Sequence, residues 1–431
     1  MNNPFQIAIL GIFLVAAVVA ALIFGGVLPG FSGGGAVGQK EITYTLWGPL
    51  DAGQMESFFA AIKPLQKKVS FAYRQINAAF YEKELLEAFA SGQGPDFWFI
   101  SENLILKHKN KANPISFKTI PLNDFKNTFI DEADLFLDYK NQNIIAMPFT
   151  IDPLLMYYNK NHFSGAFITL PPKNWREFSE VSKKLTIKQG ADIKQSGAAL
   201  GEYSNIVNVK EILSAFILQA GSAIVGQDGA VDLGAKSGTE NAVLSAVSFY
   251  SSYSDARSAN YSWNKFFGNS FNSFIQGKLS VYFGMASEFK EIKEKNSNLD
   301  FAVALFPQPE NTFSKITYGK MWGIAASNVS RKSADELIFG ANFITSREAQ
   351  EALGKVFYSA PARRDVLASP PDDQFKTVFY NSAVISRSWF DPDSEKTSIA
   401  FKNMVEFINK KEMNGTQALA YLKNQLLSLL K

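Results

Sequence analysis

Residues 147–163 read MPFTIDPLLMYYNKNHF and place polar side chains inside an apolar segment. The segment contains one carboxylate, at Asp152, and the phenols of Tyr157 and Tyr158 follow it. Such groups need hydrogen-bonding partners among apolar residues, because burial without a partner is costly. Two interpretations are open. Either these groups face a bound ligand, or the tyrosines pack in a core and Asp152 only turns the chain before Pro153.

Composition excludes several kinds of catalytic and metal site. The chain has no cysteine, which removes disulfides, thiolate chemistry and cysteine-based zinc sites. The two histidines, His108 and His162, are too few for a histidine metal cluster and make a Ser-His-Asp triad improbable. We therefore predict no metal, no cofactor and no catalytic residues. The net charge of +3 also argues against a nucleic-acid partner, and the basic run at 107–111 is interpreted as a solvated loop.

Two glycine-rich matches to known motifs are rejected. Residues 30–34 (GFSGG) fit the nucleophile-elbow pattern, and residues 33–38 (GGGAVG) fit the dinucleotide fingerprint. The first chemistry needs a strand, a turn and a helix with a histidine nearby, and the second needs a preceding strand. Neither context is present, so we interpret both matches as parts of a flexible linker.

The N-terminal sequence predicts a membrane segment. Residues 7–28 form an apolar run, and no charged residue precedes Lys40. The run is about as long as the ~20 residues that span a bilayer, and the start lacks the positive charge of a secretory signal. We predict an uncleaved anchor with a short tail at 1–6 in the cytoplasm. The alternative is a cleaved signal with a small-residue site at 36–38.

The rest of the chain alternates apolar strands with amphipathic helices. In the first part, strands are predicted at 42–47, 69–76 and 97–100, and helices at 54–67 and 80–91. Further on, helices are predicted at 209–220, 240–253 and 288–295, and strands at 279–283, 301–305 and 321–327. Strands separated by helices of this length imply parallel pairing in an α/β fold. A length of 431 residues favours two domains.

Capping patterns predict the starts of some of the later helices. Asn174 can cap a helix, and Glu177 three residues on can return the hydrogen bond. Thr345 and Glu348 have the same spacing and predict another helix start. The tail from 398 to 430 is interpreted as two amphipathic helices that break near Asn414.

The order of these elements from residue 41 onward resembles family 1 extracellular solute-binding proteins, the sugar-type receptors of ABC importers. The segments that carry the resemblance are ITYTLWG, SGQGPDFWFIS, NIIAMPFTIDPLLMYYNKNHF, LPPKNWREFSEVSKKL, FIQGKLSVYFG, TSREAQEALGK and YSAPARRDV. The resemblance implies an α/β, two-lobe, periplasmic-binding-protein-like (type II) fold with hinge crossings, here preceded by one N-terminal transmembrane helix. We expect a linker at 29–39, an N-terminal lobe at 40–152 and 324–360, and a C-terminal lobe at 153–323 and 361–431.

The resemblance also implies a ligand held between the lobes, and the segment containing Asp152 would be the first crossing. Sugar rings lie flat on aromatic side chains, and their hydroxyls need polar partners. The candidate ligand-binding residues stand at strand ends and crossings: Trp47, Asp51, Ser101, Glu102, Asp152, Trp263, Trp322, Arg363 and Trp389. Trp98 and Trp175 are predicted to pack instead. One departure is that residues 285–288 (MASE) lack the aromatic platform that many members of the family place there.

The implied function is that of a membrane-anchored extracellular receptor. It would capture a small polar solute, a carbohydrate in the first place, by lobe closure and deliver it to an ABC permease. The expected location is the cell membrane, with residues 7–28 as a single pass and the C-terminal part extracellular. Peptides, polyamines and other polar solutes stay open as ligands. The alternatives are a sensor or adhesion ectodomain on the same fold, or a glycan-active enzyme.

Overall fold

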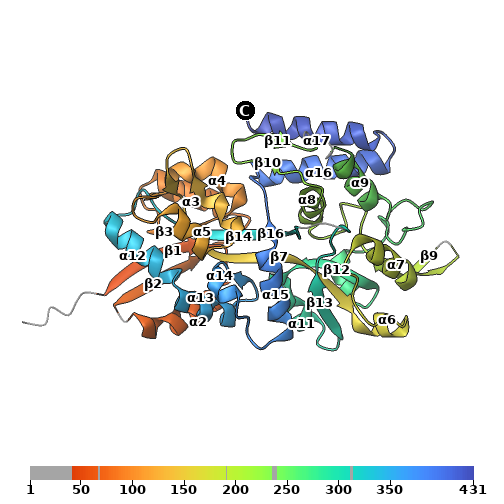
Figure 1. The fold of residues 1–431 in the computed structure, drawn as a ribbon, viewed down its shortest axis with the longest axis horizontal. Helices are drawn as coiled ribbons and strands as arrows, with labels where there is room; N and C mark the ends of the chain where they lie inside the picture. The colour runs from red at the N-terminus through yellow and green to blue at the C-terminus, as the bar shows by residue number, and fades with distance from the viewer. Residues whose placement is uncertain (1–40, 67, 191, 235–239, 311–313) are drawn as a thin grey trace, which may run out of the picture.

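The computed structural model describes residues 41–66, 68–190, 192–234, 240–310 and 314–431 of the chain. The two predicted lobes lie side by side (Figure 1). Among the described residues, no helix is both long and apolar enough to cross a membrane. The predicted tail at 1–6, span at 7–28 and linker at 29–39 lie outside the described residues, as do both rejected glycine motifs.

The N-terminal lobe is built on a sheet whose strand order is β2-β1-β3-β14-β7. Strand β1 (Ile42–Gly48) pairs in parallel with β2 (Val69–Gln75) and with β3 (Phe97–Ile100), so the predicted strands and their parallel pairing are confirmed. The helices of this lobe are α2 (Ala52–Ile62), α3 (Tyr81–Ala90), α4 (Glu102–His108), α5 (Leu122–Thr128), α12 (Ala334–Ile344) and α13 (Arg347–Val356). The predicted helix at 54–67 ends at Ile62 because Pro64 follows, and η1 (Lys63–Leu65) replaces its last turn.

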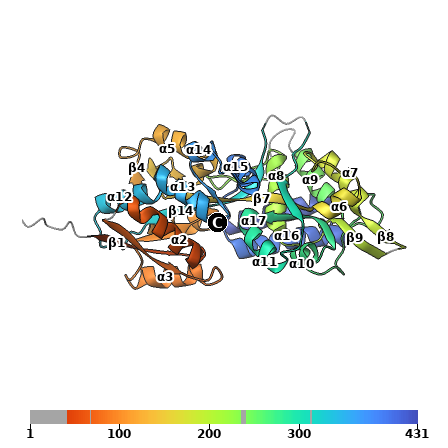
Figure 2. The ribbon, with the colours of Figure 1, turned by 90° about the horizontal axis from the view of Figure 1, so that it is seen from below.

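The C-terminal lobe continues the same sheet in the order β7-β12-β9-β8, and β13 also pairs with β7. Its strands are β8 (Ile187–Gln189), β9 (Asp192–Ala198), β12 (Leu279–Met285) and β13 (Phe301–Leu305). Its helices are α6 (Lys160–Gly165), α7 (Trp175–Leu185), α8 (Val209–Gln219), α9 (Glu240–Ser251), α10 (Ser270–Ile275), α11 (Phe289–Lys295), α15 (Gln374–Val384), α16 (Ser394–Asn409) and α17 (Gly415–Leu429). Figure 2 views the molecule from below, and α16 and α17 lie behind the rest of the C-terminal lobe in this view.

Smaller elements complete the described chain. Three short strands form one small sheet in the order β4-β6-β5, and two form another, β10-β11. Their bounds are β4 (Ile115–Ser116), β5 (Leu137–Asp138), β6 (Asn143–Ile144), β10 (Ile224–Val225) and β11 (Val231–Asp232). The short helices are η2 (Lys109–Lys111), η3 (Asp131–Phe136), η4 (Ala286–Glu288) and α14 (Arg364–Leu367).

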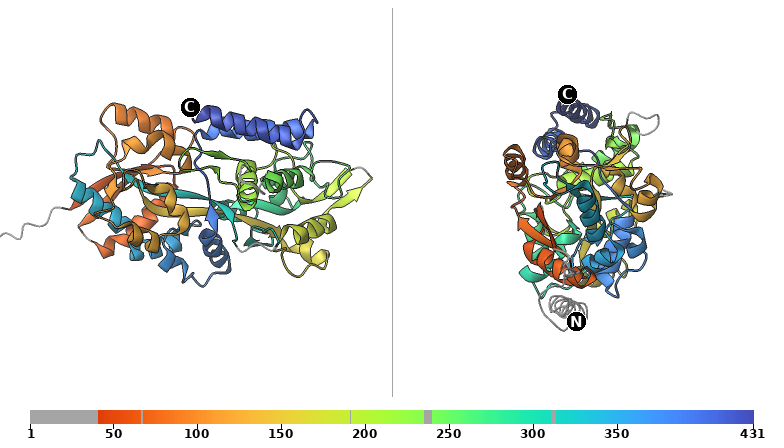
Figure 3. Two further views of the ribbon diagram at one scale, coloured as in Figure 1. Left: turned by 45° about the horizontal axis from the view of Figure 1, so that its top comes forward. Right: turned by 90° about the vertical axis from the view of Figure 1, so that its left-hand side faces the viewer.

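Two long strands join the lobes. Strand β7 (Met147–Asn159) pairs with β14 (Thr317–Ala326) at one end and with β12 and β13 at the other. The chain returns a third time through β15 (Ala360–Pro361), which pairs with β7, while β16 (Ser386–Arg387) pairs with β14. These strands run through the junction between the two lobes (Figure 3). The exact lobe boundaries given above stay predictions.

Local sequence signals explain most helix starts. Asn174 caps α7 by accepting a hydrogen bond from the Glu177 backbone N–H at 2.9 Å, as predicted, while the Glu177 carboxylate accepts from the backbone of Lys173. The cap of α13 lies one residue later than predicted, at Ser346. The tail forms α16 and α17 with Asn414 as the cap between them, which confirms the predicted pair of helices.

Aromatic side chains fill both cores. Trp98 is fully buried, and Trp175 stacks on Phe216 of α8 with ring centroids 4.4 Å apart, so both predicted packing roles are confirmed. Tyr157 is also fully buried, and its hydroxyl donates to the Met285 carbonyl at 2.8 Å. Tyr158 packs on Phe163 at 4.6 Å. For the two tyrosines, the packing interpretation is therefore the one that fits.

Candidate functional site

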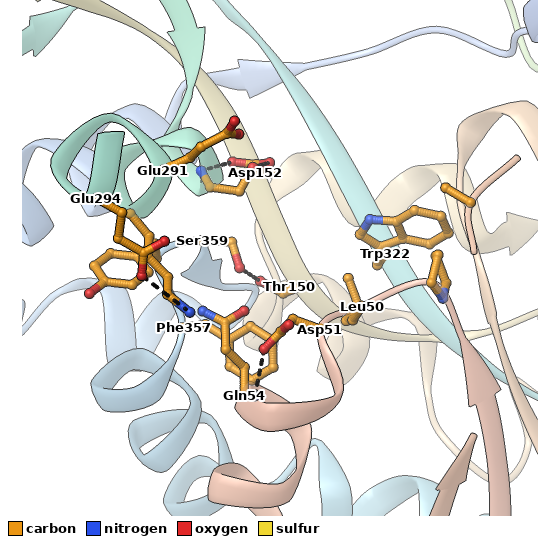
Figure 4. Close-up of a pocket in the computed structure, with 15 residues that line it drawn as sticks. Leu50, Asp51, Gln54, Thr150, Asp152, Glu291, Glu294, Trp322, Phe357 and Ser359 are labelled. Carbon is orange, nitrogen blue, oxygen red and sulfur yellow. Dashed lines mark hydrogen bonds and ion pairs between the residues drawn. The ribbon is translucent and has the colours of Figure 1, made fainter. Parts of the chain in front are cut away.

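A cavity of about 390 Å³ lies where the two lobes meet, against the crossing strands. Its lining residues come from both lobes and from the crossings: Pro49, Leu50, Asp51, Gln54, Ala78, Thr150, Asp152, Ser287, Lys290, Glu291, Glu294, Trp322, Phe357, Tyr358 and Ser359. Figure 4 shows Trp322 and Leu50 on one side of this cavity, with Glu291 and Glu294 on the other. Side chains of both lobes can thus contact one small molecule.

The floor of the cavity follows from strand geometry. Successive side chains of a strand alternate between faces, so Thr150 and Asp152 share one face of β7. In the antiparallel register, Trp322 lies opposite Thr150, and Lys320 lies opposite Asp152. The intervening Ile151 is fully buried on the other face. The crossing strands therefore present an indole, a carboxylate and a hydroxyl to the cavity, and Lys320 lies beside them outside the lining.

Asp152 is held in place from the C-terminal lobe. Its two carboxylate oxygens accept hydrogen bonds from the backbone N–H of Ser287 at 2.9 Å and from the Ser287 hydroxyl at 2.6 Å. Burial raises the pKa of Asp152, while these hydrogen bonds and the charge of Lys320 oppose that shift. The carboxylate keeps lone pairs for further donors, such as the hydroxyls of a ligand.

Trp322 is half-buried and oriented by two contacts. The edge of Phe99 meets its ring with centroids 6.3 Å apart, and the Lys320 ammonium lies 4.8 Å from the ring centroid. Contacts of this kind restrain an aromatic side chain without covering all of its surface. The exposed part of the ring lines the cavity, where it can pack against the apolar face of a ligand.

Both lobes contribute charged side chains to the walls. In the N-terminal lobe, Asp51 caps α2 by accepting from the Gln54 backbone at 2.9 Å and remains exposed. In the C-terminal lobe, Glu291 and Glu294 on α11 line the cavity with Lys290. The lining is thus richer in carboxylates than in ammonium groups. Within the described part of the chain, no group of three or more His, Asp or Glu side chains could hold a metal ion.

Of the predicted ligand-binding residues, the structure brings Asp51, Asp152 and Trp322 together in this cavity. Ser101 and Glu102 do not line it and are buried at the end of β3. One oxygen of Glu102 accepts from the Tyr318 hydroxyl at 3.1 Å, and the other has no hydrogen-bond partner among the described residues. Burial raises the pKa of Glu102, and the charge of Lys320 opposes that shift, so Lys320 acts on Glu102 as well as on Asp152.

A second buried acid nearby gives a pH prediction. Burial raises the pKa of Glu132 to about 8, although the Ser388 hydroxyl and Arg387 oppose the shift. In the unfolded chain the group titrates near 4.5, so the folded state binds more protons between the two values. We expect its contribution to stability to be complete below about pH 4.5 and to be lost as the pH rises through about 8.

The substitution Glu132→Gln should therefore flatten the fall in unfolding free energy between pH 5 and pH 8. Urea titrations at several pH values can measure this slope. Glu87→Gln serves as the control for the substitution itself, because the Glu87 side chain is 66% exposed. An unchanged slope in Glu132→Gln would contradict the assignment.

Two predicted tryptophans lie in the C-terminal core. Trp263 is fully buried, stacks on Phe267 at 4.4 Å and donates from Nε1 to Asn205 at 3.1 Å. Trp389 is 2% exposed and donates from Nε1 to the Ser214 hydroxyl of α8 at 2.9 Å. Their rings are covered and their N–H groups are satisfied, so both pack the lobe, and neither side chain lines the cavity.

The two remaining predicted ligand-binding residues are Trp47 and Arg363. Trp47 is half-buried on β1, and the Arg74 guanidinium lies 4.5 Å from its ring centroid. Arg363 forms an ion pair with Asp365, with Nε and Oδ1 3.0 Å apart. Neither side chain lines the cavity.

Sequence reasoning did not single out several of the lining residues. Thr150 could have been found, because it stands two positions before the predicted Asp152 and so shares its face of the strand. Ser287 belongs to the MASE segment that departs from the expected aromatic platform, and the structure gives it the hydrogen bonds to Asp152. Glu291, Glu294 and Phe357 carry no local signal.

Comparisons with known proteins agree with this architecture. Residues 59–377 match the model of a family described as bacterial extracellular solute-binding proteins. The sugar-binding protein MalE of Xanthomonas citri superposes with a TM-score of 0.73 at 16% identity, covering 90% of this chain and 97% of that one. A cyclo/maltodextrin-binding protein complexed with maltotetraose superposes with a TM-score of 0.70 at 17% identity, covering 89% and 96%.

A curated relative matches over a shorter stretch. The sn-glycerol-3-phosphate-binding periplasmic protein of Yersinia enterocolitica is 29% identical over 115 residues, which are 24% of this chain and 26% of that protein. The chain therefore matches only about a quarter of this relative's length. The family and the similar structures are described as binding proteins, in agreement with the prediction that the chain is not an enzyme.

Proposed function

The chain belongs to the bacterial extracellular solute-binding proteins, and we propose that it captures a carbohydrate in the cavity between its lobes and delivers it to an ABC permease. The family match also confirms the predicted kinship with solute-binding proteins and agrees with a location of the C-terminal part outside the cytoplasm. The choice of a carbohydrate is supported by the fold shared with sugar-binding receptors and by the chemistry of the cavity.

The observation that carries the proposal is the pairing of Trp322 with Asp152 on the cavity floor. An indole surface and a hydrogen-bonding carboxylate side by side match the apolar face and the hydroxyl edge of a sugar ring. A ligand without those hydroxyls would leave the carboxylate poorly satisfied, so the same pair provides specificity. Asp51 and Ser287 supply further polar groups from the two lobes.

The proposed mechanism is closure of the lobes around the ligand. The floor belongs to the crossing strands, whereas Leu50 and Glu291 lie on opposite walls. A ligand that contacts both walls binds the closed form more tightly than the open form and shifts the population towards closure. The closed form would then dock on the permease. We further propose that residues 7–28 anchor the receptor in the cell membrane, which raises its effective concentration near its transporter.

A second ligand class follows from the acidic lining. Asp51, Asp152, Glu291 and Glu294 face the same space as a single lining ammonium group, that of Lys290. A solute with amino groups, such as a polyamine, would be attracted electrostatically to that space. Carbohydrate binding and polyamine binding differ in their dependence on salt, because screening weakens only the second strongly.

The proposal is tested by a thermal-shift screen of the full chain in detergent. The ligands are monosaccharides, maltooligosaccharides and mannooligosaccharides first, then amino acids, peptides and polyamines. A ligand at about 100 times its Kd stabilises the folded state by about 2.7 kcal/mol, which raises the Tm measurably. A salt-insensitive shift with a sugar supports the proposal. A shift with polyamines alone would replace the carbohydrate by the second class, and no shift with any class would contradict a receptor function.

A further inference from the structure

A second cavity lies within the C-terminal lobe, apart from the lobe junction. Its volume is about 710 Å³, and its lining residues fall between 202 and 266 and between 406 and 411. They come from the loop after β9, from the C-terminal ends of α9 and α16, and from the loops that follow these two helices. Figure 1 shows these two helices in the upper part of the C-terminal lobe. The proposed function makes no use of this cavity.

Six of the lining residues are serines, and the hydroxyl of one of them lacks a partner. Ser248, Ser251, Ser252 and Ser254 line the cavity from α9 and the loop that follows it. Ser251 is 8% exposed, and its hydroxyl has no hydrogen-bond partner among the described residues. A buried hydroxyl without a partner is unfavourable, so a ligand that supplies a hydrogen bond at this point would be stabilised.

An exposed aromatic ring lies at the same cavity. Phe266 lines it and is 86% exposed, although the Lys265 ammonium lies 5.4 Å from the ring centroid. Water-exposed phenylalanine rings of this kind offer an apolar face to a ligand. The amide side chains of Asn264 and Asn409, which also line the cavity, add both donors and acceptors.

The charges of the lining balance, because it carries three carboxylates and three ammonium groups. The Asp255 carboxylate pairs with Arg257, with Oδ2 and Nη2 2.9 Å apart, and the Glu406 carboxylate pairs with Lys410 at 3.0 Å. Ion pairs of this kind leave little net field to select a strongly charged ligand. Hydroxyls, amides and an aromatic face beside paired charges match a neutral ligand that is itself rich in hydroxyls.

We propose that this cavity is a second carbohydrate-binding site, for a neutral oligosaccharide whose ring packs on Phe266 and whose hydroxyls pair with Ser251 and its neighbours. The site is independent of the cavity between the lobes. It would let the receptor hold a glycan on the outer face of the C-terminal lobe while the lobes open and close. Two sites on one chain also raise the local concentration of a glycan that carries both determinants.

The test uses the full chain with Trp322→Ala and Asp152→Ala, which disable the lobe cavity. Isothermal titration with maltotetraose, mannotriose and cellotetraose should still detect binding of at least one of these probes. Adding Phe266→Ala should weaken that binding at least about tenfold, since the aromatic face is lost. Phe167→Ala is the matched control, because Phe167 is 90% exposed in the same lobe but lies outside the cavity, and it should leave Kd unchanged.

A second variant separates binding from folding. Ser251→Ala removes the buried hydroxyl without adding bulk and should weaken the binding about three- to tenfold with little change in the Tm of the unliganded chain. The proposal is overturned if none of the three probes binds the chain with the disabled lobe cavity. It is equally overturned if binding persists unchanged in both Phe266→Ala and Ser251→Ala. Failure of the lobe cavity as a site would appear differently: the unmodified chain would bind the probes with the same stoichiometry and Kd as the chain with Trp322→Ala and Asp152→Ala, and Phe266→Ala alone would weaken all of the binding.

Discussion

Trp322→Ala is expected to weaken carbohydrate binding by about 30- to 150-fold, which corresponds to about 2–3 kcal/mol for an aromatic residue at the centre of a binding site. The ring lines the cavity from a crossing strand, where Phe99 and Lys320 restrain it before any ligand arrives. Its loss removes the apolar surface on which a sugar ring would pack, and a small methyl group cannot replace it. Isothermal titration with the best ligand of the thermal-shift screen measures the change.

The matched control is Trp47→Ala. Trp47 is also a half-buried tryptophan on a strand of the N-terminal lobe, and it too has a cation over its ring, that of Arg74 at 4.5 Å. It differs from Trp322 in lying outside the cavity. We expect Kd to stay within about twofold of the unmodified chain, the scatter typical of positions without contact to a ligand. Equal losses in both variants would contradict the cavity as the binding site.

The variant Trp322→Phe helps to distinguish loss of ligand contact from loss of folding. A phenyl ring keeps an aromatic surface at the same place, so we expect it to recover part of the affinity lost in the alanine variant. A structural role of the indole in the strand would instead lower the Tm of the unliganded chain in both variants. Comparing Kd with that Tm therefore separates loss of ligand contact from loss of folding.

Most of the framework could be predicted from the sequence, because its signals are local. Strand β3 is a run of four apolar residues between Asp96 and Ser101, and its predicted bounds match those observed. Asn174 and Asn414 cap their helices through hydrogen bonds to residues three positions away. Such interactions depend on neighbours in the chain and not on the tertiary fold.

Only some of the residues that line the cavity could be predicted from the sequence. Asp152 stood out because a carboxylate in an apolar strand requires a special environment, and the structure places it in the cavity. The tryptophans gave no comparable signal, since an indole suits a core as well as a ligand. Which role each one takes depends on distant residues, as with Ser214, which accepts the Trp389 N–H across 175 positions. The pairing of Arg363 with Asp365, two residues on, is the one contact of the predicted residues outside the cavity that local spacing could have revealed.

The segment that carries Trp389 is fastened to the C-terminal lobe by a buried ion pair. The Lys210 ammonium on α8 and the Asp391 carboxylate are hydrogen-bonded, with side chains only 11% and 5% exposed. Lys210 also donates to the Thr397 hydroxyl at 2.8 Å, and that hydroxyl donates to Asp391 at 2.8 Å. The pair therefore ties α8 to the start of α16 within one network.

Lys210→Met is expected to lower the free energy of unfolding by about 3–5 kcal/mol, because the Asp391 carboxylate would be left buried without its partner. Urea unfolding measures the loss. Adding Asp391→Leu should restore much of the stability, since removing both charges also removes the uncompensated one. Arg257→Met, which breaks an exposed ion pair with Asp255, is the control and should change little.

The same variant tests the structural role of Trp389. If this residue only packs against α8, Lys210→Met should leave the Kd for a carbohydrate unchanged at temperatures where the chain stays folded. The reason is that neither Lys210 nor Trp389 lines the cavity between the lobes. A large loss of affinity in the fully folded chain would instead mean that this network sets the closed arrangement of the lobes. Ligand binding would then depend on Trp389 as well.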